Sequence, residues 1–479
     1  MVRKISNLRE HCGIIGIYSF DHDEDISSDL FIGLEALQHR GQESWGIVVH
    51  DHEPYKRMGL VSQNENEYEK IKKIKGNIGI GHVRYSTIGR TTIGNAHPIK
   101  IDSSLYIAHN GTLEREPLIE YLREKGNSPS EQMTDTKLLG LGISKLRKEG
   151  KDWVEAFEIL NEKLNGSFSL IMLTNEGELI VARDERGFRP LCLGWKEDNS
   201  SYVVVSESCA LDTIKAKILR DVEPGEIIKI DKNGLEKYKF SEKKHAHCPF
   251  EYTYFAHPTS VIEGQNVYYA RKEIGKELFK KYPLDGDVVI PVPDSARPSA
   301  LGYSEVSGIP FEEGLMKDRY RKKGSLRSFI EPEKREEIVS NIIPIRQIIE
   351  GKHVILIDDS IVRGTSSKTI VWDKLRDAKS VSLLLDFPPI LYPCYMGIDF
   401  PTQDELSAFK FSSSSKSLEK INEKVREELG VKFVGYNDVD GLSRGIGLPK
   451  EELCLACTTG NYSCLKYPPK FKTRREMKS

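Results

Sequence analysis

The first half of the chain is a succession of short apolar runs separated by polar turns. Runs of about four to eight apolar, often β-branched residues bounded by turn residues are typical of strands. Two longer segments, residues 131–148 and 153–164, have apolar positions at helical spacing instead. Strands mixed with clustered helices favour a layered sheet sandwich over a parallel α/β unit. The predicted strands are residues 12–18, 46–50, 78–85, 105–109, 168–173, 179–183 and 202–206.

In the second half the pattern becomes an alternation of strands and helices. Apolar runs at residues 287–293, 354–357 and 381–386 are separated by segments with helical spacing. The run 354–357 is apolar at every position, which indicates a strand buried on both faces. Such an alternation predicts a parallel sheet with its binding groups at the carboxyl ends of the strands. The boundary between the halves is expected in the polar stretch 241–247.

Length and charge narrow the class of protein. A chain of 479 residues is expected to form two or three domains. Its 70 basic and 72 acidic residues give a net charge of −2, and no block of like charge suggests nucleic acid as a partner. No run approaches the roughly 18 apolar residues of a membrane span, and the leader 1–11 is too polar and short for a signal peptide. The sequence therefore predicts a cytoplasmic protein that binds neither nucleic acid nor a membrane.

The most informative stretch is residues 353–367. A buried strand ends there in Asp358 and Asp359, and a hydroxyl-rich turn, residues 360–365, leads into a helical pattern. Backbone N–H groups at a helix start attract phosphate, and carboxylates at a strand end accept hydrogen bonds from vicinal hydroxyls. The order of these features indicates a site for a phosphorylated sugar. The alternative is a solvated loop or a helix cap.

Polar groups also follow strands in the first half. Arg84 lies in GHVRYST, Asn110 and Gly111 lie in AHNGTL, and Asp135 lies in MTDTKLL. Each has a structural alternative when taken alone: a surface ion pair for Arg84, a hairpin turn for the Asn-Gly pair, and a helix cap for Asp135.

Together with Cys12, these clusters resemble the glutamine amidotransferases whose N-terminal nucleophile is a cysteine. The segments CGIIGIY, LQHRGQES, GHVRYST and AHNGTL and the segment around Asp135 occur in the order and rough spacing of that family. Over nearly the whole chain the resemblance is closest to the amidophosphoribosyltransferase family, in its iron–sulfur type with an N-terminal propeptide. It implies an N-terminal nucleophile αββα sandwich followed by a type I phosphoribosyltransferase parallel-sheet domain. The implied parts are a propeptide (1–11), a glutaminase domain (12–245), a phosphoribosyltransferase domain (246–445) and a C-terminal tail with cluster ligands (446–479).

The resemblance gives the first-half residues chemical roles. Removal of the propeptide would free the α-amine of Cys12, whose ordinary pKa near 8 suits it to activate the thiol as a base. Cys12 would then attack the amide carbonyl of glutamine, form a thioester and release ammonia. Asn110 and Gly111 are implied to form the oxyanion hole. Arg84 and Asp135 are implied to bind the α-carboxylate and α-amine of glutamine.

For the second half, the resemblance implies a phosphoribosylpyrophosphate site. Asp358 and Asp359 would hold the ribose hydroxyls, and Ser295 with the same acid pair would organise Mg²⁺. Lys317 and Arg319 fall on the family's pyrophosphate-binding positions, although the basic loop that follows is longer than the usual pattern and is otherwise typical of a solvated loop. The residues implied to cradle the 5′-phosphate are Ser360, Ile361, Val362, Arg363, Gly364 and Thr365.

The cysteines add a second candidate cofactor. Cys454 and Cys457 form a C-x-x-C pair, which alone is compatible with zinc, a redox dithiol or chance. The resemblance adds Cys248 and Cys394 as ligands and so implies a [4Fe–4S] cluster with a structural or oxygen-sensing role. Cys192, Cys209 and Cys464 have no matched role.

The implied reaction joins the two sites. Ammonia from glutamine would be transferred to C1 of 5-phosphoribosyl-1-pyrophosphate, giving 5-phosphoribosylamine, pyrophosphate and glutamate, the first committed step of de novo purine (IMP) biosynthesis. The family also implies inhibition by purine nucleotides and a homo-oligomer, with a tetramer as the expected form. Two alternatives are a glutamine amidotransferase with another acceptor, such as a sugar phosphate or aspartate, and a catalytically silent nucleotide-binding regulator.

Overall fold

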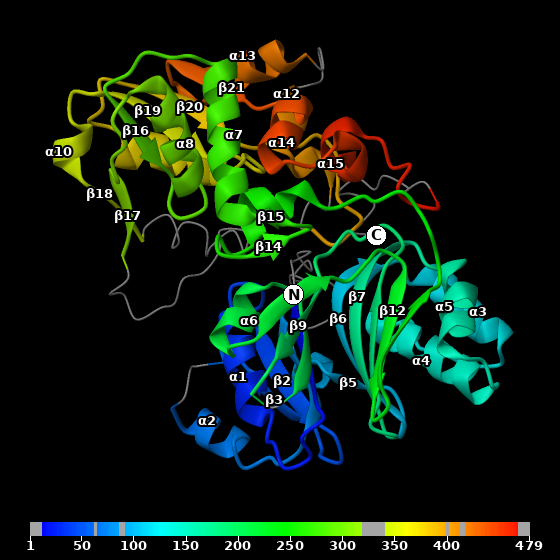
Figure 1. The fold of residues 1–479 in the computed structure, drawn as a ribbon. Coiled ribbons are helices and arrows are strands. Elements are labelled where there is room, and N and C mark those ends of the chain that lie inside the picture. Colours follow the sequence, from blue (N-terminus) through cyan, green and yellow to red (C-terminus); the bar gives the residue numbers. More distant parts are fainter. Residues whose placement is uncertain are drawn as a thin grey trace, which may run out of the picture.

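The computed structural model describes residues 12–61, 65–85, 92–198, 200–318, 341–398, 402–411 and 417–467. Two stacked antiparallel sheets are built from the first half of the chain, and a parallel sheet is built from the second (Figure 1). Within the described residues, no helix is long and apolar enough to cross a membrane.

The first antiparallel sheet has β1 near its centre. β1 (Gly13–Ser19) pairs with β4 (Ile78–Arg84) on one side and β10 (Ser201–Val205) on the other. The strand order is β11-β9-β10-β1-β4-β2-β3. Its other strands are β2 (Ser44–Val49), β3 (Tyr55–Met58), β9 (Cys192–Lys196) and β11 (Lys217–Asp221), and its helices are α1 (Ser27–Ala36), α2 (Glu65–Ile71) and α6 (Cys209–Thr213).

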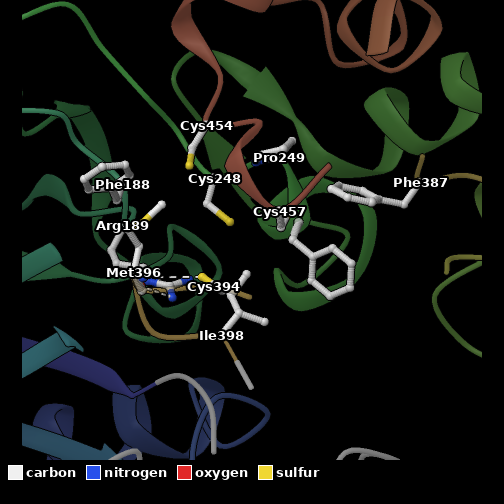
Figure 2. Close-up of a pocket in the computed structure, with 11 residues that line it drawn as sticks. Phe188, Arg189, Cys248, Pro249, Phe387, Cys394, Met396, Ile398, Cys454 and Cys457 are labelled. Atoms are coloured by element: carbon white, nitrogen blue, oxygen red, sulfur yellow. Dashed lines mark hydrogen bonds between the residues drawn. The ribbon is translucent and has the colours of Figure 1, made fainter. Parts of the chain in front are cut away.

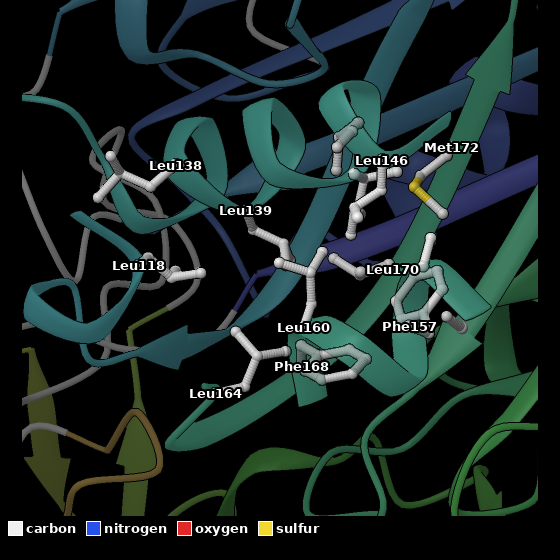
Figure 3. Packing of buried hydrophobic residues seen from close by; sticks show 14 of the residues in the cluster. Leu118, Leu138, Leu139, Leu146, Phe157, Leu160, Leu164, Phe168, Leu170 and Met172 are labelled. Carbon is white, nitrogen blue, oxygen red and sulfur yellow. The ribbon is translucent and has the colours of Figure 1, made fainter. Parts of the chain in front are cut away.

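The second antiparallel sheet has the order β13-β12-β8-β7-β6-β5. Its outer face packs on three helices through a leucine- and phenylalanine-rich core (Figure 3). Its strands are β5 (Ile99–Lys100), β6 (Leu105–Leu113), β7 (Gly166–Thr174), β8 (Leu179–Arg183), β12 (Glu226–Asp231) and β13 (Gly234–Lys239), and its helices are α3 (Glu116–Glu124), α4 (Asp135–Lys148) and α5 (Trp153–Asn161).

Alternation along the strands explains why the two sheets stack. In β1, Ile15 and Ile17 pack toward the helices, whereas Ile14 and Tyr18 pack toward the other sheet. In β7, Leu170 and Met172 face the helices in the same way, and the intervening residues face inward. Because successive side chains of a strand point to opposite faces, both sheets are covered on both sides. The predicted αββα sandwich is confirmed.

The parallel sheet has the order β16-β19-β20-β21. Val354 and Leu356 of β19 pack on one face with η3 and α13, while Ile355 and Ile357 pack on the other with α7 and α8. The prediction that this strand is buried on both faces is therefore confirmed. The strands are β16 (Val288–Pro291), β19 (His353–Asp358), β20 (Ser380–Leu385) and β21 (Phe433–Tyr436), and the helices are α7 (Val267–Lys281), α8 (Arg297–Ser307), α10 (Arg346–Ile349), α11 (Thr365–Thr369), η3 (Ile370–Lys374), α12 (Ser407–Phe411) and α13 (Leu418–Leu429).

Several shorter elements surround this sheet and the junction between the two halves. The C-terminal part returns to the junction, where His247 forms a parallel bridge with Leu453. These elements are β14 (Val261–Ile262), β15 (Gln265–Asn266), β17 (Leu315–Lys317), β18 (Ile342–Pro344), α14 (Val439–Ile446) and α15 (Ala456–Thr459), with the single turns η1 (Ile93–Asn95), η2 (Glu251–Phe255), η4 (Gln403–Glu405) and η5 (Lys450–Glu452).

Some predicted boundaries were wrong. The helix expected from residue 131 begins at Asp135, because Thr134 caps it by accepting a hydrogen bond from the N–H of Lys137. The strand expected at 105–109 runs on to Leu113, since its last residues pair with the start of β7. The helical face expected after residue 365 ends at Lys374, before Ala378.

Candidate functional site

Cys12 lies directly before β1, at an end of the central strand of the first sheet. Its Sγ donates a hydrogen bond to the carbonyl oxygen of Tyr85 at 3.6 Å. Burial raises the pKa of the thiol to about 11, against the opposing effect of the Arg84 and Arg40 guanidinium groups. A thiol with this pKa is protonated at neutral pH and is a poor nucleophile. In the chain as it stands, with residue 11 still attached, Cys12 is therefore unactivated.

The strands bring the predicted glutamine-site residues around Cys12. Arg84 is buried at the end of β4, one residue beyond the Gly13–Val83 pair. The charges of Arg84 and Asp135 both act on the Cys12 thiol. A hydrogen bond from the His82 ring to the carbonyl oxygen of His109, at 3.0 Å, joins β4 to β6 between the two sheets.

The side-chain amide of Asn110 is buried and makes no hydrogen bond within the described residues. It lies on β6 opposite Ser169 and is 1% exposed. Within the described residues, neither its Nδ2 nor its Oδ1 has a hydrogen-bond partner. A buried polar group left unpaired costs about 1–3 kcal/mol, so such groups call for a functional explanation.

The next residue, Gly111, has a backbone conformation that only glycine adopts without strain. Its φ is +151°, and a Cβ at this position would lie 2.2 Å from the carbonyl oxygen of Ser167. Gly111 lies within the β6–β7 pairing, opposite Phe168. The Asn-Gly pair is therefore part of a strand, and the hairpin-turn alternative is wrong.

Asp135 is held at the first turn of α4. Its Oδ2 accepts a hydrogen bond from the N–H of Leu113 at 3.0 Å, and its Oδ1 accepts one from Thr136 at 2.8 Å. The cap of this helix is Thr134, so the cap alternative for Asp135 is wrong. Asp135 is 5% exposed, and its charge opposes ionisation of the Cys12 thiol.

Three buried histidines adjoin this site and were not assigned by sequence reasoning. The rings of His82 and His97 are 4.3 Å apart, and His109 interacts with Thr136 at 2.9 Å. Burial lowers the pKa of His82 to about 3 and also lowers those of His97 and His109. They are neutral at physiological pH. Two of them were visible in the motifs GHVRYST and AHNGTL.

The second predicted site lies at the carboxyl end of β19. Asp359 accepts hydrogen bonds from Ser295 Oγ at 2.5 Å and from Ser360 Oγ at 2.7 Å. Asp358 accepts one from the N–H of Asp359 at 2.9 Å. Burial, together with the charge of Asp359, raises the pKa of Asp358 well above its ordinary value. The acid pair is buried, so the simple solvated-loop alternative is wrong.

A third acid, Asp386, belongs to the same group and was missed as a site residue. It follows β20, is 0% exposed, and accepts a hydrogen bond from Ser299. Burial raises its pKa well above the ordinary value, and the charge of Asp359 contributes. Among the described residues its Oδ2 has no hydrogen-bond partner. The signal was available in the sequence, because the predicted strand 381–386 also ends in an aspartate.

The turn after the acid pair presents mainly its backbone. The side chains of Ile361 and Val362 are buried in the cores on either side, and Arg363 pairs with Glu405 at 3.0 Å. Gly364 has a φ of +82° and directly precedes α11, whose first residue is Thr365. A turn of this kind offers backbone N–H groups to an anion at the start of a helix.

Of the predicted pyrophosphate-binding cations, Lys317 lies at the end of β17. Its Nζ pairs with Asp294 at 2.9 Å, in the segment that also contains Ser295. Arg319 and the basic loop lie outside the described residues.

Arg40 joins the two halves of the molecule and had no predicted role. Its side chain is buried, donates to the Cys12 carbonyl oxygen at 3.1 Å, and pairs with Glu207 and with Glu251 at 2.9 Å. Glu251 lies on η2, at the entry to the second half. Removing one partner of such a buried pair leaves an uncompensated charge, which is strongly destabilising. The nucleophile segment is thereby fixed to the junction.

Glu207 also belongs to a group of three potential metal ligands. Its carboxylate and the ligand atoms of His39 and Cys209 lie within 4.8 Å of one another. The carboxylate already accepts hydrogen bonds from Ser260 Oγ at 2.8 Å and from the N–H of His257 at 2.7 Å, besides its pair with Arg40. We interpret this group as part of the junction rather than as a metal centre.

Four of the cysteines line one pocket at the junction (Figure 2). Cys248 begins the second half, Cys394 follows β20, and the other two, Cys454 and Cys457, flank the start of α15. The remaining lining is mostly apolar, with the guanidinium of Arg189 at one side. The N–H of Met396 donates to Cys394 Sγ at 3.4 Å. Sulfur donors in an apolar pocket suit a metal centre that prefers thiolates.

Comparisons with known proteins agree with this division of the chain. A family model described as a glutamine amidotransferase domain matches residues 82–213. The amidophosphoribosyltransferase of Methanothermobacter thermautotrophicus is 42% identical over 470 residues, covering 95% of each chain. That of Bacillus subtilis is 39% identical over 481 residues, covering 96% of each chain. A solved structure of the B. subtilis glutamine phosphoribosylpyrophosphate amidotransferase, complexed with ADP and GMP, has a TM-score of 0.80 and 37% identity, covering 94% of this chain and 97% of that one.

Proposed function

The chain belongs to the amidophosphoribosyltransferase family, and from this premise we propose how its own residues carry out the family's reaction. The protein is a glutamine amidotransferase that transfers ammonia to phosphoribosylpyrophosphate in the first step of purine biosynthesis. The observation that supports our residue assignment best is that the charges of Arg84 and Asp135 both act on the Cys12 thiol. The buried amide of Asn110, which has no hydrogen-bond partner among the described residues, supports its own assignment.

We propose that the glutaminase half is activated by loss of residues 1–11. In the attached state the thiol of Cys12 has a raised pKa, and its own nitrogen is locked in a peptide bond. Cleavage would supply an α-amine on the same residue, with an ordinary pKa near 8, that takes the thiol proton. The thiolate then attacks the glutamine amide carbonyl, and the α-ammonium returns the proton to the departing nitrogen, which leaves as ammonia while a thioester forms. Water hydrolyses the thioester to glutamate and frees the thiol. Arg84 and Asp135 hold the α-carboxylate and α-amine of the substrate.

The Asn110 amide and the backbone N–H of Gly111 are proposed to receive the oxyanion. Replacing Asn110 by alanine removes one donor, which is expected to lower the kcat of glutamine hydrolysis by about 10²–10³-fold. Asn233→Ala, at an exposed turn, is the matched control and should leave kcat unchanged. The measurement is glutamate release under saturating glutamine. A full-rate N110A enzyme would contradict the assignment of this amide to the oxyanion hole.

In the second half, we propose that the turn 360–365 cradles the 5′-phosphate while Asp358 and Asp359 hold the ribose hydroxyls. Ser295 and the acid pair would hold Mg²⁺, since hard cations prefer oxygen ligands. When bound, the ion neutralises the departing pyrophosphate. Lys317 and Arg319 are proposed to bind the same leaving group. Burial opposes ionisation of Asp358, and bound Mg²⁺ would favour its charged form. Once ionised, the carboxylates act strongly in this site of low dielectric on the positive charge that develops at the anomeric carbon.

The four-cysteine pocket is proposed to hold a [4Fe–4S] cluster through Cys248, Cys394, Cys454 and Cys457. Four thiolates are the usual complement of such a cluster. Within the described residues, no three of these sulfur atoms lie within 4.8 Å of one another. A zinc ion binds each sulfur at about 2.3 Å, which puts any two of its sulfur ligands within about 4.6 Å of each other. The wider spacing of these sulfur atoms therefore favours a multinuclear centre over zinc. The guanidinium of Arg189 offsets the negative charge of the thiolates.

The cluster proposal predicts iron and sulfide in protein purified without oxygen. The cluster would tie the junction to the C-terminal segment, and a cross-link that closes a loop this long stabilises a protein by about 3–5 kcal/mol. Chelation of the iron is therefore expected to lower the melting temperature and to expose the C-terminal segment to proteases. Iron and sulfide analysis, visible absorption and limited proteolysis measure these effects. Anaerobic protein that lacks both elements would contradict the proposal.

Regulation and assembly are also part of the proposal. The B. subtilis relative was solved with ADP and GMP, and we propose that purine nucleotides inhibit this enzyme as well. We further propose a cytoplasmic homo-oligomer, with a tetramer as the expected form. Pyrophosphate release assayed with and without nucleotide tests the inhibition, and light scattering in solution tests the oligomeric state.

One assay tests the two-site function directly. We expect pyrophosphate release from phosphoribosylpyrophosphate with glutamine as donor, and also with ammonium salts at alkaline pH, where free ammonia is available. A silent regulator would release none with either donor. An amidotransferase with another acceptor would hydrolyse glutamine without releasing pyrophosphate.

A further inference from the structure

A fifth cysteine, Cys464, adjoins the four that line the pocket. Its thiol lies beside that of Cys454, and the two interact directly. The charge of Cys464 also acts on Cys394, which comes from a different segment. Cys394, Cys454 and Cys464 pack in one cluster of side chains with Phe188 and Tyr462. The site therefore offers five sulfur atoms, one more than a cluster of this type requires.

Cys464 is held in this position by ordered contacts on both sides. Before it, the hydroxyl of Tyr462 donates to the carbonyl oxygen of Pro393, next to Cys394. After it, the N–H of Lys466 donates to Asn165 Oδ1 at 3.2 Å, which fixes the chain to the residue directly before β7 in the glutaminase half. The N–H of Leu465 closes a turn onto Tyr462 at 2.9 Å. A thiol presented by a segment pinned in this way does not need a large rearrangement to reach the pocket.

The two neighbouring thiols enter from different directions. Cys454 comes from the strand-like segment that pairs with residue 247, whereas Cys464 comes from the turn after α15. The thiol of Cys457, on α15 itself, is instead influenced by the charges of Cys394 and Cys248. Among the described residues, Cys454 is the pocket cysteine whose thiol interacts directly with that of Cys464.

We propose that Cys464 is a reserve ligand that replaces Cys454 at the same iron of the cluster. This inference rests on the proposed cluster. In the exchange, the iron–sulfur bond to Cys454 breaks as a bond to Cys464 forms, and the proton lost by Cys464 is taken up by the Cys454 thiolate. No electron is transferred, so the exchange needs no oxidant or reductant. The C-terminal segment thereby stays bound to the cluster at the junction when Cys454 can no longer act as a ligand.

Alanine variants test the exchange, because alanine offers no ligand atom. C454A and C457A are matched, since each removes one of the four primary ligands. We expect anaerobic C454A to retain iron and sulfide within about twofold of the unchanged protein, because a fourth thiolate is still available. We expect the double variant C454A/C464A to lose at least about tenfold, because three thiolates remain. We expect the same loss in C457A, because Cys464 adjoins Cys454 and not the position that Cys457 vacates. C464A should bind a full cluster.

Thiol alkylation under native anaerobic conditions gives a second readout. In the unchanged holoprotein Cys464 should react with iodoacetamide, whereas in C454A it should be protected until a chelator removes the iron. Electron paramagnetic resonance of the reduced C454A protein should show a cluster signal with altered g values.

The outcomes distinguish a failure of the ligand exchange from a failure of the proposed cluster. If the unchanged protein holds no iron, the cluster itself is wrong. If the unchanged protein holds a cluster but C454A contains as little iron as C457A, only the exchange is wrong. The same conclusion follows if C454A is as insoluble as C457A while C464A is soluble. Cys464 that stays reactive in iron-loaded C454A would also overturn it.

Discussion

Replacing Cys12 by alanine is expected to abolish formation of phosphoribosylamine from glutamine while sparing its formation from ammonia. Loss of a covalent nucleophile typically costs about 10³-fold or more in kcat. The ammonia-dependent rate should stay within about twofold of the unchanged enzyme, because Asp358 and Asp359 lie in the other half of the chain and need no thiol. Pyrophosphate release with each donor is the measurement. C209A, which removes another buried thiol of the same half, is the matched control.

Processing should follow the same logic. Intact mass of the active enzyme should correspond to a chain that starts at Cys12, and a variant that retains residues 1–11 should have only the ammonia-dependent activity. Glutamine-dependent activity in a chain whose mass still includes the leader would refute the proposed role of the α-amine. It would leave the cysteine itself as a candidate nucleophile.

Replacing Asp359 by asparagine is expected to have the converse effect, lowering activity with both donors. Asp359 joins Ser295, Ser360 and the neighbouring carboxylate, so its charge is central to the proposed metal and ribose site. We expect a loss of about 10²–10³-fold in kcat/KM for phosphoribosylpyrophosphate, the range found when a group that stabilises transition-state charge is removed. The glutamine site should remain intact, as judged by labelling of Cys12 with an electrophilic glutamine analogue. D373N, at an exposed position, is the matched control.

The same variant should change the pH dependence of the magnesium requirement. In the unchanged protein, burial and the charge of Asp359 raise the pKa of Asp358. Protons therefore compete with Mg²⁺ for this carboxylate, and the apparent affinity for Mg²⁺ should rise with pH until the raised pKa is passed. In D359N the like charge is gone, so the pKa of Asp358 falls and this dependence should weaken. An unchanged pH profile of the magnesium requirement in D359N would contradict the proposed coupling.

The sequence predicted best those features that local patterns determine. The apolar run 354–357, the acid pair after it and the loop glycine lie together in sequence and remain together in the fold. The strands of the first half were located from runs of β-branched residues, and the layered architecture followed from their number. The family resemblance then supplied roles that no local pattern contains.

What escaped prediction depends on pairing between distant segments. In the sequence, Arg40 lies in a segment that predicts a polar turn. Its ion pairs with Glu207 and Glu251 depend on the fold, which brings these distant residues together. In the sequence, Asp386 is an acidic residue at the end of a predicted strand. Its place beside Asp358 and Asp359 depends on the pairing of β20 with β19. The unpaired amide of Asn110 is likewise a property of the β6–β7 register, which no short window of sequence determines.

The bridge between residue 247 and residue 453 has a consequence for synthesis of the protein. The N–H of His247 donates to the carbonyl oxygen of Glu452, and the N–H of Cys454 donates back to His247, each at 2.8 Å. The two strands of this bridge thus come from segments far apart in the sequence, and the second is synthesised after most of both halves. The two halves can each begin to fold during translation, because domains generally fold as units. Their junction stays open until residues 452–454 have been synthesised, so a product terminated before residue 452 would lack the hydrogen bonds that close the junction.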